Sequence, residues 1–171
     1  RPAEFDFIHL HTDSLALPLA RRQRTPCLLT LHGRLDMVGL PEVFAEFSEM
    51  PLASISYAQR QAIPHANWIA NVHHGLPLDQ YTFVPIPQQY LAFLGRVSPE
   101  KRVDHAIEIA RRAGLPLKIA AKVDPRDAEY FTRTIEPLLA TAGVEFIGEI
   151  GDSDKGGFLG NAVALLFPID W

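Results

Sequence analysis

The chain has 171 residues, of which 47% are hydrophobic and 21% charged, a composition typical of folded α/β domains and not of a disordered tail. The net charge of −4 argues against a general nucleic-acid-binding surface, and no run of apolar residues is long enough to predict a membrane span. The single cysteine, Cys27, cannot form an intrachain disulfide and is interpreted as a buried thiol in a reduced cytoplasm.

Apolar runs of strand length alternate with helical patterns along the chain. Most of these runs are almost continuously hydrophobic, as expected for parallel strands that are covered on both faces. The alternation predicts β-α units joined by right-handed crossovers. The expected strands are 5–10, 26–31, 53–56, 68–72, 90–95, 117–121, 144–148 and 162–169.

The clearest predicted helix spans 99–113, with Ser98 as its N-cap, Pro99 in its first turn and Gly114 at its end. A second helix is predicted over about 125–140, with Asp124 as its N-cap.

Residues 76–89 are rich in proline and polar side chains and have no hydrophobic period, which is typical of a linker. We therefore expect an α/β protein with two partial Rossmann-like parallel sheets, one before and one after this segment. The last expected strand leaves the second sheet open, so we also expect self-association through open sheet edges.

A basic turn follows the expected strand 90–95. Arg96, Lys101 and Arg102 lie near a helix start, at the carboxyl edge of the sheet where open α/β folds bind ligands. Free backbone N–H groups and cations together favour an anion, most naturally a phosphate. A solvated turn that Glu100 partly neutralises is the alternative interpretation.

Histidines follow two of the expected strands. His9, His11 and Asp13 form an H-x-H-x-D pattern that could hold zinc, although a polar strand end beside a cleft explains it as well. His32 ends the strand 26–31 and precedes Gly33, where the missing Cβ lets a ligand approach. The remaining histidines (His65, His73, His74 and His105) are interpreted as hydrogen-bonding, packing or surface residues.

Several segments resemble family 4 (group 1) glycosyltransferases, which have the GT-B fold. The segment YLAFLGRVSPEKRVDHAIEIARRAGLPLKIAAKVD resembles the start of their donor-binding domain, and VEFIGEIGDSDKGGFLGNAVALLFPIDW resembles its continuation. TLHG, SISYAQR and HHGLP resemble parts of their first domain.

The resemblance implies a division of the chain into three parts. Residues 1–75 would be part of an N-terminal, acceptor-side domain, 76–89 the linker, and 90–171 the first part of the C-terminal, donor-binding domain. The resemblance also implies an internal piece that is truncated at both ends, with a Glu-containing EPFG segment expected beyond it, so that the piece itself would not transfer sugar.

The implied activity is that of a retaining hexosyltransferase-like enzyme in glycan biosynthesis. It would move a sugar from a nucleoside-diphosphate sugar to an unknown acceptor, in the cytoplasm, with neither metal nor other cofactor and without nucleic acid as a partner. The implied catalytic residues are His32, Arg96 and Lys101, and the implied donor-binding residues are Gly33, Gly95, Ile150, Asp152 and Lys155.

The sequence departs from the family pattern at two positions. Arg102 stands where glycine is common, and His74 replaces the usual asparagine. Three alternatives remain open at this stage, namely a GT-B-like sugar-nucleotide epimerase, a non-catalytic binding protein, and a zinc metallohydrolase built on His9, His11 and Asp13.

Overall fold

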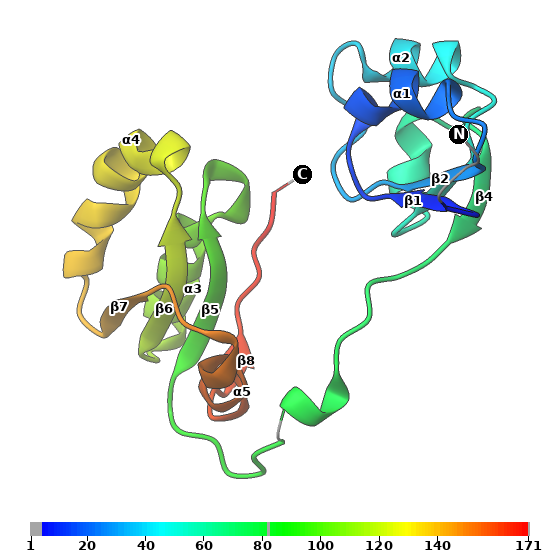
Figure 1. Ribbon diagram of the computed structural model, residues 1–171. Helices are drawn as coiled ribbons and strands as arrows, with labels where there is room; N and C mark the ends of the chain where they lie inside the picture. Colours follow the sequence, from blue (N-terminus) through cyan, green and yellow to red (C-terminus); the bar gives the residue numbers. More distant parts are fainter. Residues whose placement is uncertain (1–4, 82, 171) are drawn as a thin grey trace. The chain divides into compact units, whose positions relative to one another are not determined.

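The computed structural model describes residues 5–81 and 83–170. The chain divides into two compact units between Leu76 and Pro77, inside the segment interpreted as a linker. Each unit contains one four-stranded parallel sheet, and Figure 1 shows the course of the chain through both. The predicted α/β class with two separate parallel sheets is therefore confirmed.

The N-terminal unit is built on strands that pair in sequence order. They are β1 (Ile8–Leu10), β2 (Cys27–Thr30), β3 (Leu52–Ser54) and β4 (Trp68–Asn71). Helices α1 (Leu17–Arg21) and α2 (Leu40–Glu46) lie on one side of this sheet (Figure 1). The described connections also include 3-10 turns at Ser14–Ala16 and Gln59–Ala62.

Large apolar side chains from both layers form the core of this unit. Leu29 and Leu52 from the strands meet Leu17 and Phe44 from the helices, and all four are almost completely buried. Burying each such side chain contributes about 1.5–3 kcal/mol, so this core fixes the sheet and thereby the positions at which its strands end.

The C-terminal unit has the strand order β7-β6-β5-β8. The strands are β5 (Leu91–Val97), β6 (Leu117–Val123), β7 (Val144–Gly148) and β8 (Ala164–Leu165). Helix α3 (Val103–Ala113) buries Val103, Ala106, Ile107 and Ala110 against this sheet. Helix α5 (Asp152–Gly160) precedes β8 along the chain.

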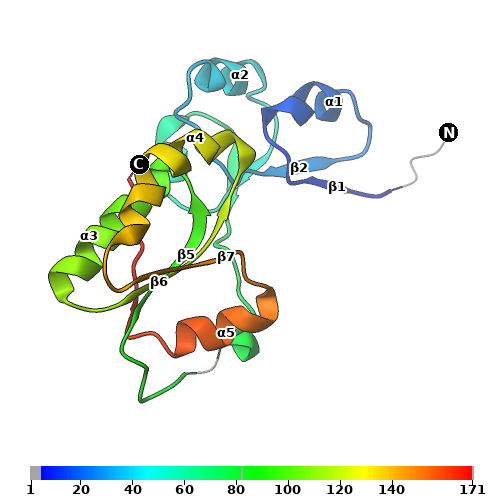
Figure 2. The same ribbon diagram turned by 90° about the vertical axis from the view of Figure 1, so that its left-hand side faces the viewer.

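The expected helix over 125–140 is present as an irregular helical stretch. It comprises a 3-10 turn at Pro125–Asp127, α4 (Ala128–Tyr130), a π segment at Phe131–Ile135 and another 3-10 segment at Glu136–Ala140. This stretch lies beside α3 (Figure 2). Asp124 caps its start as predicted, because its side chain accepts a hydrogen bond from the Arg126 N–H at 3.0 Å.

The prediction of one helix over 99–113 was wrong at its start. Pro99–Lys101 form a 3-10 turn, and Arg102 adopts the left-handed conformation with φ 54° before α3 begins at Val103. Ser98 makes no side-chain cap hydrogen bond. The end was predicted correctly, since Gly114 terminates α3 at φ 66°.

The last strand is much shorter than the expected 162–169. Only Ala164 and Leu165 pair with β5, opposite Leu91 and Ala92. Leu166 donates one more backbone hydrogen bond to the Ala92 carbonyl at 2.8 Å, and the chain then leaves the ladder at Pro168, which has no N–H to donate. Among the helices in the described part of the chain, none has the length and apolar character needed to cross a membrane.

Two adjacent glycines of α5 provide a test of how this helix packs. A Cβ at Gly156 would overlap with the backbone carbonyl of Gln80, in the 3-10 turn Leu78–Gln80, whereas a Cβ at Gly157 would meet no atom within 4 Å. We expect Gly156→Ala to destabilise α5 by about 1–3 kcal/mol, because the two segments must separate. Gly157→Ala is the matched control and should stabilise the helix by about 0.5–1 kcal/mol.

Hydrogen exchange of the α5 amides measures both effects. Exchange should be faster than in the wild type for Gly156→Ala and unchanged or slower for Gly157→Ala. Equal exchange in the two variants would contradict the close approach of α5 to Gln80.

Candidate functional site

Four histidines lie together at the carboxyl edge of the N-terminal sheet. We call His9, His11, His32 and His74 the histidine row, because adjacent members are in contact. His11 Nδ1 lies 2.9 Å from His32 Nε2, and His32 Nδ1 lies 3.5 Å from His74 Nε2. The rings of His9 and His11 are 4.2 Å apart, and His9 also hydrogen-bonds the Thr30 hydroxyl at 2.8 Å.

The topology explains why these residues meet. His9 lies in β1, His11 follows β1, His32 follows β2 and His74 follows β4, and the carboxyl ends of parallel strands share one edge. The hydrogen-bonding role predicted for His74 is confirmed, and the structure identifies His32 as its partner.

The surroundings of His32 favour its neutral form. Partial burial, followed by the neighbouring His74 and His11, lowers the pKa of His32 below its ordinary value, and Asp13 opposes this shift only in part. A hydrogen bond between two imidazoles also requires one nitrogen without a proton, and double protonation would break it. Both ring nitrogens of His32 are thus engaged, Nε2 by His11 and Nδ1 by His74.

The zinc alternative finds no support in the geometry. Among residues 5–81 and 83–170, no group of three or more His, Cys, Asp or Glu side chains is arranged to hold a metal ion. The ring nitrogens of His11 and His32 face one another in a hydrogen bond instead of converging on a common point.

The strand order of the C-terminal sheet contains a switch point between β5 and β8. The chain builds β5, β6 and β7 outward in one direction and then returns to the other side of β5. Ligands of open α/β sheets bind outside the carboxyl ends of the strands at such a reversal. Here that place is bordered by residues 98–102 after β5 and by residues 166–170 after β8.

Arg96 lies at the carboxyl end of β5 and faces two carboxylates. Its guanidinium is 2.8 Å from Glu100 and 3.7 Å from Asp127. Arg96, the arginine predicted to bind phosphate, thus forms ion pairs with two carboxylates of the same unit. The predicted Gly95 lies beside it in β5, with room for a Cβ at ordinary contact distance from Phe93.

Lys101 closes the 3-10 turn after β5 and lies beside residues that follow β8. Its ammonium group is 5.5 Å from the ring centroid of Phe167. Lys101 therefore borders the switch point from the β5 side, as the basic-turn interpretation requires.

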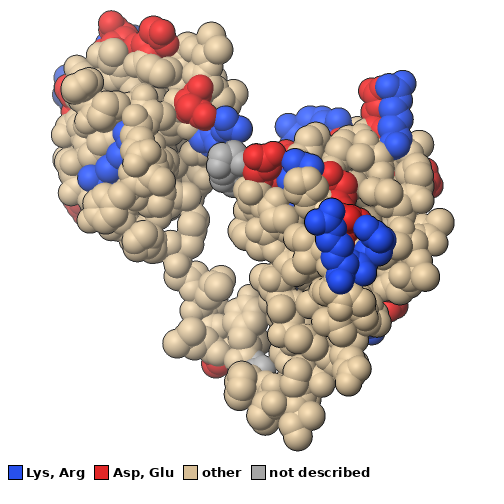
Figure 3. Space-filling model, turned by 180° about the vertical axis from the view of Figure 1, so that it is seen from behind, with Lys and Arg blue, Asp and Glu red and all other residues tan. Residues whose placement is uncertain are grey.

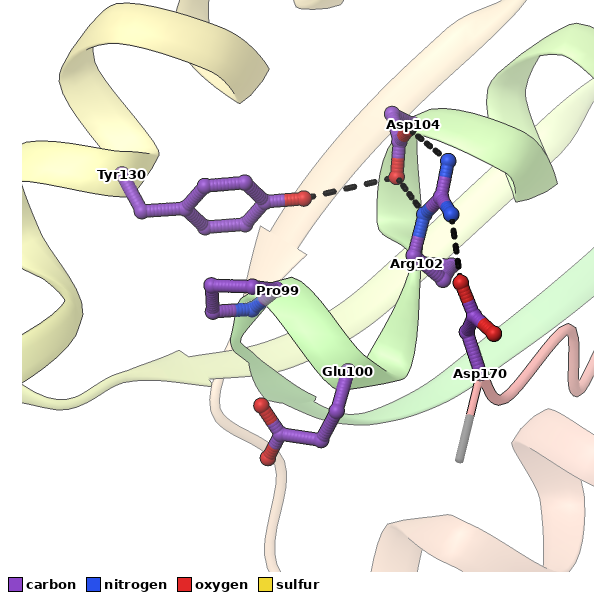
Figure 4. Close-up of a pocket in the computed structure, with 6 residues that line it drawn as sticks. All are labelled: Pro99, Glu100, Arg102, Asp104, Tyr130 and Asp170. Atoms are coloured by element: carbon purple, nitrogen blue, oxygen red, sulfur yellow. Dashed lines mark hydrogen bonds and ion pairs between the residues drawn. The ribbon is translucent and has the colours of Figure 1, made fainter.

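Arg102 lines a cavity of about 530 Å³ together with Pro99, Glu100, Asp104, Tyr130 and Asp170 (Figure 4). Its guanidinium donates two hydrogen bonds to Asp104, at 2.9 and 3.1 Å, and one to Asp170 at 3.0 Å. Because Asp170 follows β8, the Arg102–Asp170 ion pair joins the two sides of the switch point. Arg96 and Lys101 are not among the residues that line this cavity.

The charges in this cavity are fixed by their partners. Burial alone would raise the pKa of Asp104, but the hydrogen bonds and charge of Arg102 outweigh it and hold that pKa below its ordinary value. Burial, together with the neighbouring Asp104 carboxylate, raises the pKa of Tyr130 to about 12. At neutral pH the cavity thus presents an ionised carboxylate and a neutral phenol, whose hydroxyl donates to Asp104 at 3.3 Å.

The remaining predicted residues are distributed between the two units. Ile150 lies in the loop between β7 and α5, and Asp152 and Lys155 lie in the first half of α5. The Lys155 ammonium donates a hydrogen bond to Asp152 at 2.6 Å. Gly33 follows β2 in the N-terminal unit, where a Cβ would lie 3.8 Å from a carboxylate oxygen of Asp13.

Asp104, Tyr130 and Asp170 were missed in the sequence. They come from the first turn of α3, from α4 and from the segment after β8, so only the strand order reveals that they meet. One indication of this cluster was available in the sequence, namely Arg102 at a position where family 4 glycosyltransferases commonly have glycine. Its left-handed backbone explains that preference.

Basic side chains do not form one continuous surface on the face shown in Figure 3. They occur there in separate groups, several of them next to acidic side chains.

We predict that His32 titrates below pH 6.5, the ordinary value for histidine. Since its pKa is lowered in the fold, the unfolded chain takes up the proton first as the pH falls. The contribution of His32 to stability is therefore complete above about pH 6.5 and declines below it.

NMR titration of the imidazole signals measures the titration midpoint of His32. His74→Asn should raise it, because the electrostatic influence of His74, which lowers the pKa of His32, is removed. A midpoint at or above 6.5 in the wild type would refute the prediction.

We also predict a stability order for two variants of Arg102. Both Arg102→Gly and Arg102→Ala remove the ion pairs, but only alanine retains the penalty for a left-handed backbone. The glycine variant should be the more stable one by about 1 kcal/mol. Hydrogen exchange of the α3 amides measures the difference. Equal stability, or a more stable alanine variant, would show that Arg102 is not constrained in this conformation.

Comparison with known proteins places this geometry in a known fold. No protein-family model matches the sequence, and no curated protein is similar to it in sequence. Solved structures of several other proteins are similar. AviGT4, a glycosyltransferase involved in avilamycin A biosynthesis, is 23% identical with a TM-score of 0.65, and the match covers 97% of this chain and 46% of AviGT4.

Sucrose-phosphate synthase from Thermosynechococcus elongatus is 14% identical with a TM-score of 0.76, over 96% of this chain and 50% of that protein. A TarM variant from S. aureus, in complex with fondaparinux, alpha-GlcNAc-glycerol and UDP, is 13% identical with a TM-score of 0.63, over 89% of this chain and 34% of TarM. The chain therefore spans half or less of the length of these three proteins. Over that length it has the fold of GT-B glycosyltransferases.

Proposed function

We propose that this chain is part of a retaining glycosyltransferase that moves a sugar from a nucleoside-diphosphate sugar to an acceptor. One observation carries the proposal. Arg96, at the carboxyl end of β5, and Lys101, in the 3-10 turn after β5, both lie at the carboxyl edge of the sheet that contains the switch point. This is the place in an open α/β sheet where a phosphate-containing ligand is expected.

The chemistry of the leaving group explains the choice of these residues. When the bond between the sugar and the diphosphate breaks, negative charge grows on the diphosphate. The Arg96 guanidinium can bind two phosphate oxygens at once, and Lys101 adds a compact positive charge. In this proposal the two cations take the role that a metal ion has in other enzymes, so no metal cofactor is required.

The ion pairs of Arg96 are compatible with this role. Its side chain is 45% exposed, so the pairs with Glu100 and Asp127 are solvent-screened and contribute little stability. A diphosphate that carries more charge than either carboxylate can replace them. Glu100 and Asp127 would then keep the guanidinium in place until the donor binds.

The other predicted residues receive roles in the same proposal. His32 would orient a hydroxyl group of the donor or acceptor, and Gly33 and Gly95 would let the ligand approach the backbone. Ile150, Asp152 and Lys155 would border the nucleotide base. Support comes from the UDP in the TarM complex and from the sugar-transfer activities named for the other two similar proteins. The unpaired thiol of Cys27 fits a reducing compartment, so we place the protein in the cytoplasm.

We predict that, in the whole enzyme of which this chain is part, Arg96→Ala and Lys101→Ala each slow the release of nucleoside diphosphate from UDP-, GDP- or ADP-hexoses by about 10²–10³-fold. The loss should fall mainly on kcat, because the charge on the diphosphate is greatest in the transition state. Arg111→Ala is the matched control. Arg111 lies in the last turn of α3, pairs with Glu108 and is 60% exposed, so its removal should change the rate by less than about twofold.

Direct binding of UDP, GDP and ADP to the 171-residue chain, measured by calorimetry, provides a second measurement. Binding that both variants weaken about tenfold or more would support the phosphate site. Rate changes under threefold in both variants would contradict the assignment. Products in which the sugar of the donor is epimerised but not transferred would identify an epimerase instead.

A further inference from the structure

The carbonyl groups on both sides of His32 have a common hydrogen-bond donor. The Gln59 side-chain amide nitrogen donates to the Leu31 carbonyl at 3.0 Å and to the Gly33 carbonyl at 2.9 Å. Its amide oxygen accepts a hydrogen bond from the Ile55 N–H at 3.0 Å. One side chain therefore uses both of its N–H groups and its carbonyl to join three backbone positions.

The sheet explains why such a connection is needed. β2 and β3 pair through Thr30 and Ala53, and the Leu31 N–H makes one more hydrogen bond to the Ala53 carbonyl at 3.1 Å. Beyond this point the two strands separate, and the carbonyls of residues 31 and 33 need other donors. Gln59 supplies them from the 3-10 turn that follows β3.

Gln59 is itself held in place from its own backbone. Its N–H donates to the Ser56 hydroxyl at 3.1 Å, which fixes the start of the 3-10 turn Gln59–Ala62. The turn is thereby connected to the end of β3 on one side and to the backbone around His32 on the other.

We propose that Gln59 is a positioning residue for His32. It fixes the backbone immediately before and after His32, while His11 and His74 fix the direction of the imidazole ring through contacts of 2.9 and 3.5 Å. Only its catalytic consequence rests on the proposed function. The structural part stands on the geometry of the N-terminal unit alone.

The choice of glutamine follows from its hydrogen-bonding groups. A glutamate of equal length would direct a second oxygen toward two carbonyl oxygens, which is repulsive, and asparagine is one methylene too short to reach the same positions. Methionine has a similar length and flexibility but neither donates nor accepts strongly. Gln59→Met therefore removes the hydrogen bonds with little change in volume.

The test compares Gln59→Met with Gln61→Met in the 171-residue chain. Gln61 lies in the same 3-10 turn and is exposed, so it controls for the substitution itself. We expect the Ile55 amide to exchange about tenfold faster or more in Gln59→Met only, because its N–H loses the Gln59 amide oxygen as its acceptor.

A second readout reports on the ring and not on general stability. His9, His11, His74 and Asp13 are the titratable groups that act on His32. When the backbone at His32 is released, the ring should move away from its histidine neighbours, so its NMR titration midpoint should rise toward 6.5. Unchanged exchange and an unchanged His32 midpoint in Gln59→Met would overturn the proposal.

Glycosyl-transfer kinetics separate this inference from the proposed function. If both hold, Gln59→Met lowers kcat about tenfold or more and changes the KM for the donor by less than about threefold, because the donor phosphates bind at Arg96 and Lys101. Altered NMR and exchange with unchanged kcat would support the positioning role and remove His32 from the catalytic proposal.

Gln59→Glu provides a milder variant in case Gln59→Met unfolds the N-terminal unit. It keeps an acceptor for the Ile55 N–H and loses both donors, so exchange at Ile55 should remain close to that of the wild type, while the carbonyl NMR signals of Leu31 and Gly33 should shift. Faster exchange at Ile55, or unchanged carbonyl signals, would contradict the assigned hydrogen bonds.

Discussion

Both units depend on how backbone hydrogen bonding is completed where parallel strands end. Within the sheets, the backbone N–H and C=O groups of each strand are hydrogen-bonded to those of its neighbours. At the carboxyl edge the strands separate, and some backbone N–H and C=O groups need other partners. In the N-terminal unit the Gln59 amide supplies the missing donors. In the C-terminal unit the Asp170 N–H donates to the Glu100 carbonyl at 3.0 Å, and the Arg102–Asp170 ion pair reinforces this connection. Order at these edges therefore comes from particular side chains.

At the carboxyl edge of the sheet in the C-terminal unit, the ion pairs of two arginines determine which of them can bind an anion. Arg96 and Arg102 both face carboxylates, but their environments differ. Arg96 is nearly half exposed, and pairs of this kind contribute about 0–1 kcal/mol, so an incoming anion replaces them at low cost. The Arg102 side chain is only 24% exposed and makes three hydrogen bonds to two carboxylates, which makes it a structural cation. Of the two arginines, Arg96 is therefore better suited to the proposed phosphate-binding role.

Much of the fold could be predicted from the sequence because the strands of a doubly covered parallel sheet are short, apolar and separated by turn signals. All eight expected strands are present among the described residues. The prediction failed where tertiary contacts override local signals. Ser98 and Pro99 look like a helix start, yet the connection to Asp170 turns the backbone at Arg102 before the helix begins. The apolar run 162–169 predicts a long strand, but only Ala164 and Leu165 pair with β5.

The candidate site was predictable only in part, for a related reason. A residue directly after an apolar run lies at a sheet edge in any parallel arrangement, which is why His32 and Arg96 could be found. Which strand ends become neighbours depends on strand order, and the sequence contains no local signal for it. The contact of His74 with His32 requires that four strands pair in sequence order, and the contact of Asp170 with Arg102 requires the reversal at β5.

The left-handed backbone at Arg102 lies where the segments after β5 and β8 are connected. A non-glycine residue in this conformation costs about 1 kcal/mol, which a glycine would avoid. The guanidinium offsets that cost through Asp104 and Asp170, and in doing so it holds the segment after β8 against the turn that contains Glu100 and Lys101. The strain therefore lies at the switch point, between the two strand ends that border the proposed phosphate site. A glycine at this position would relax the backbone but leave the two strand ends without their side-chain connection.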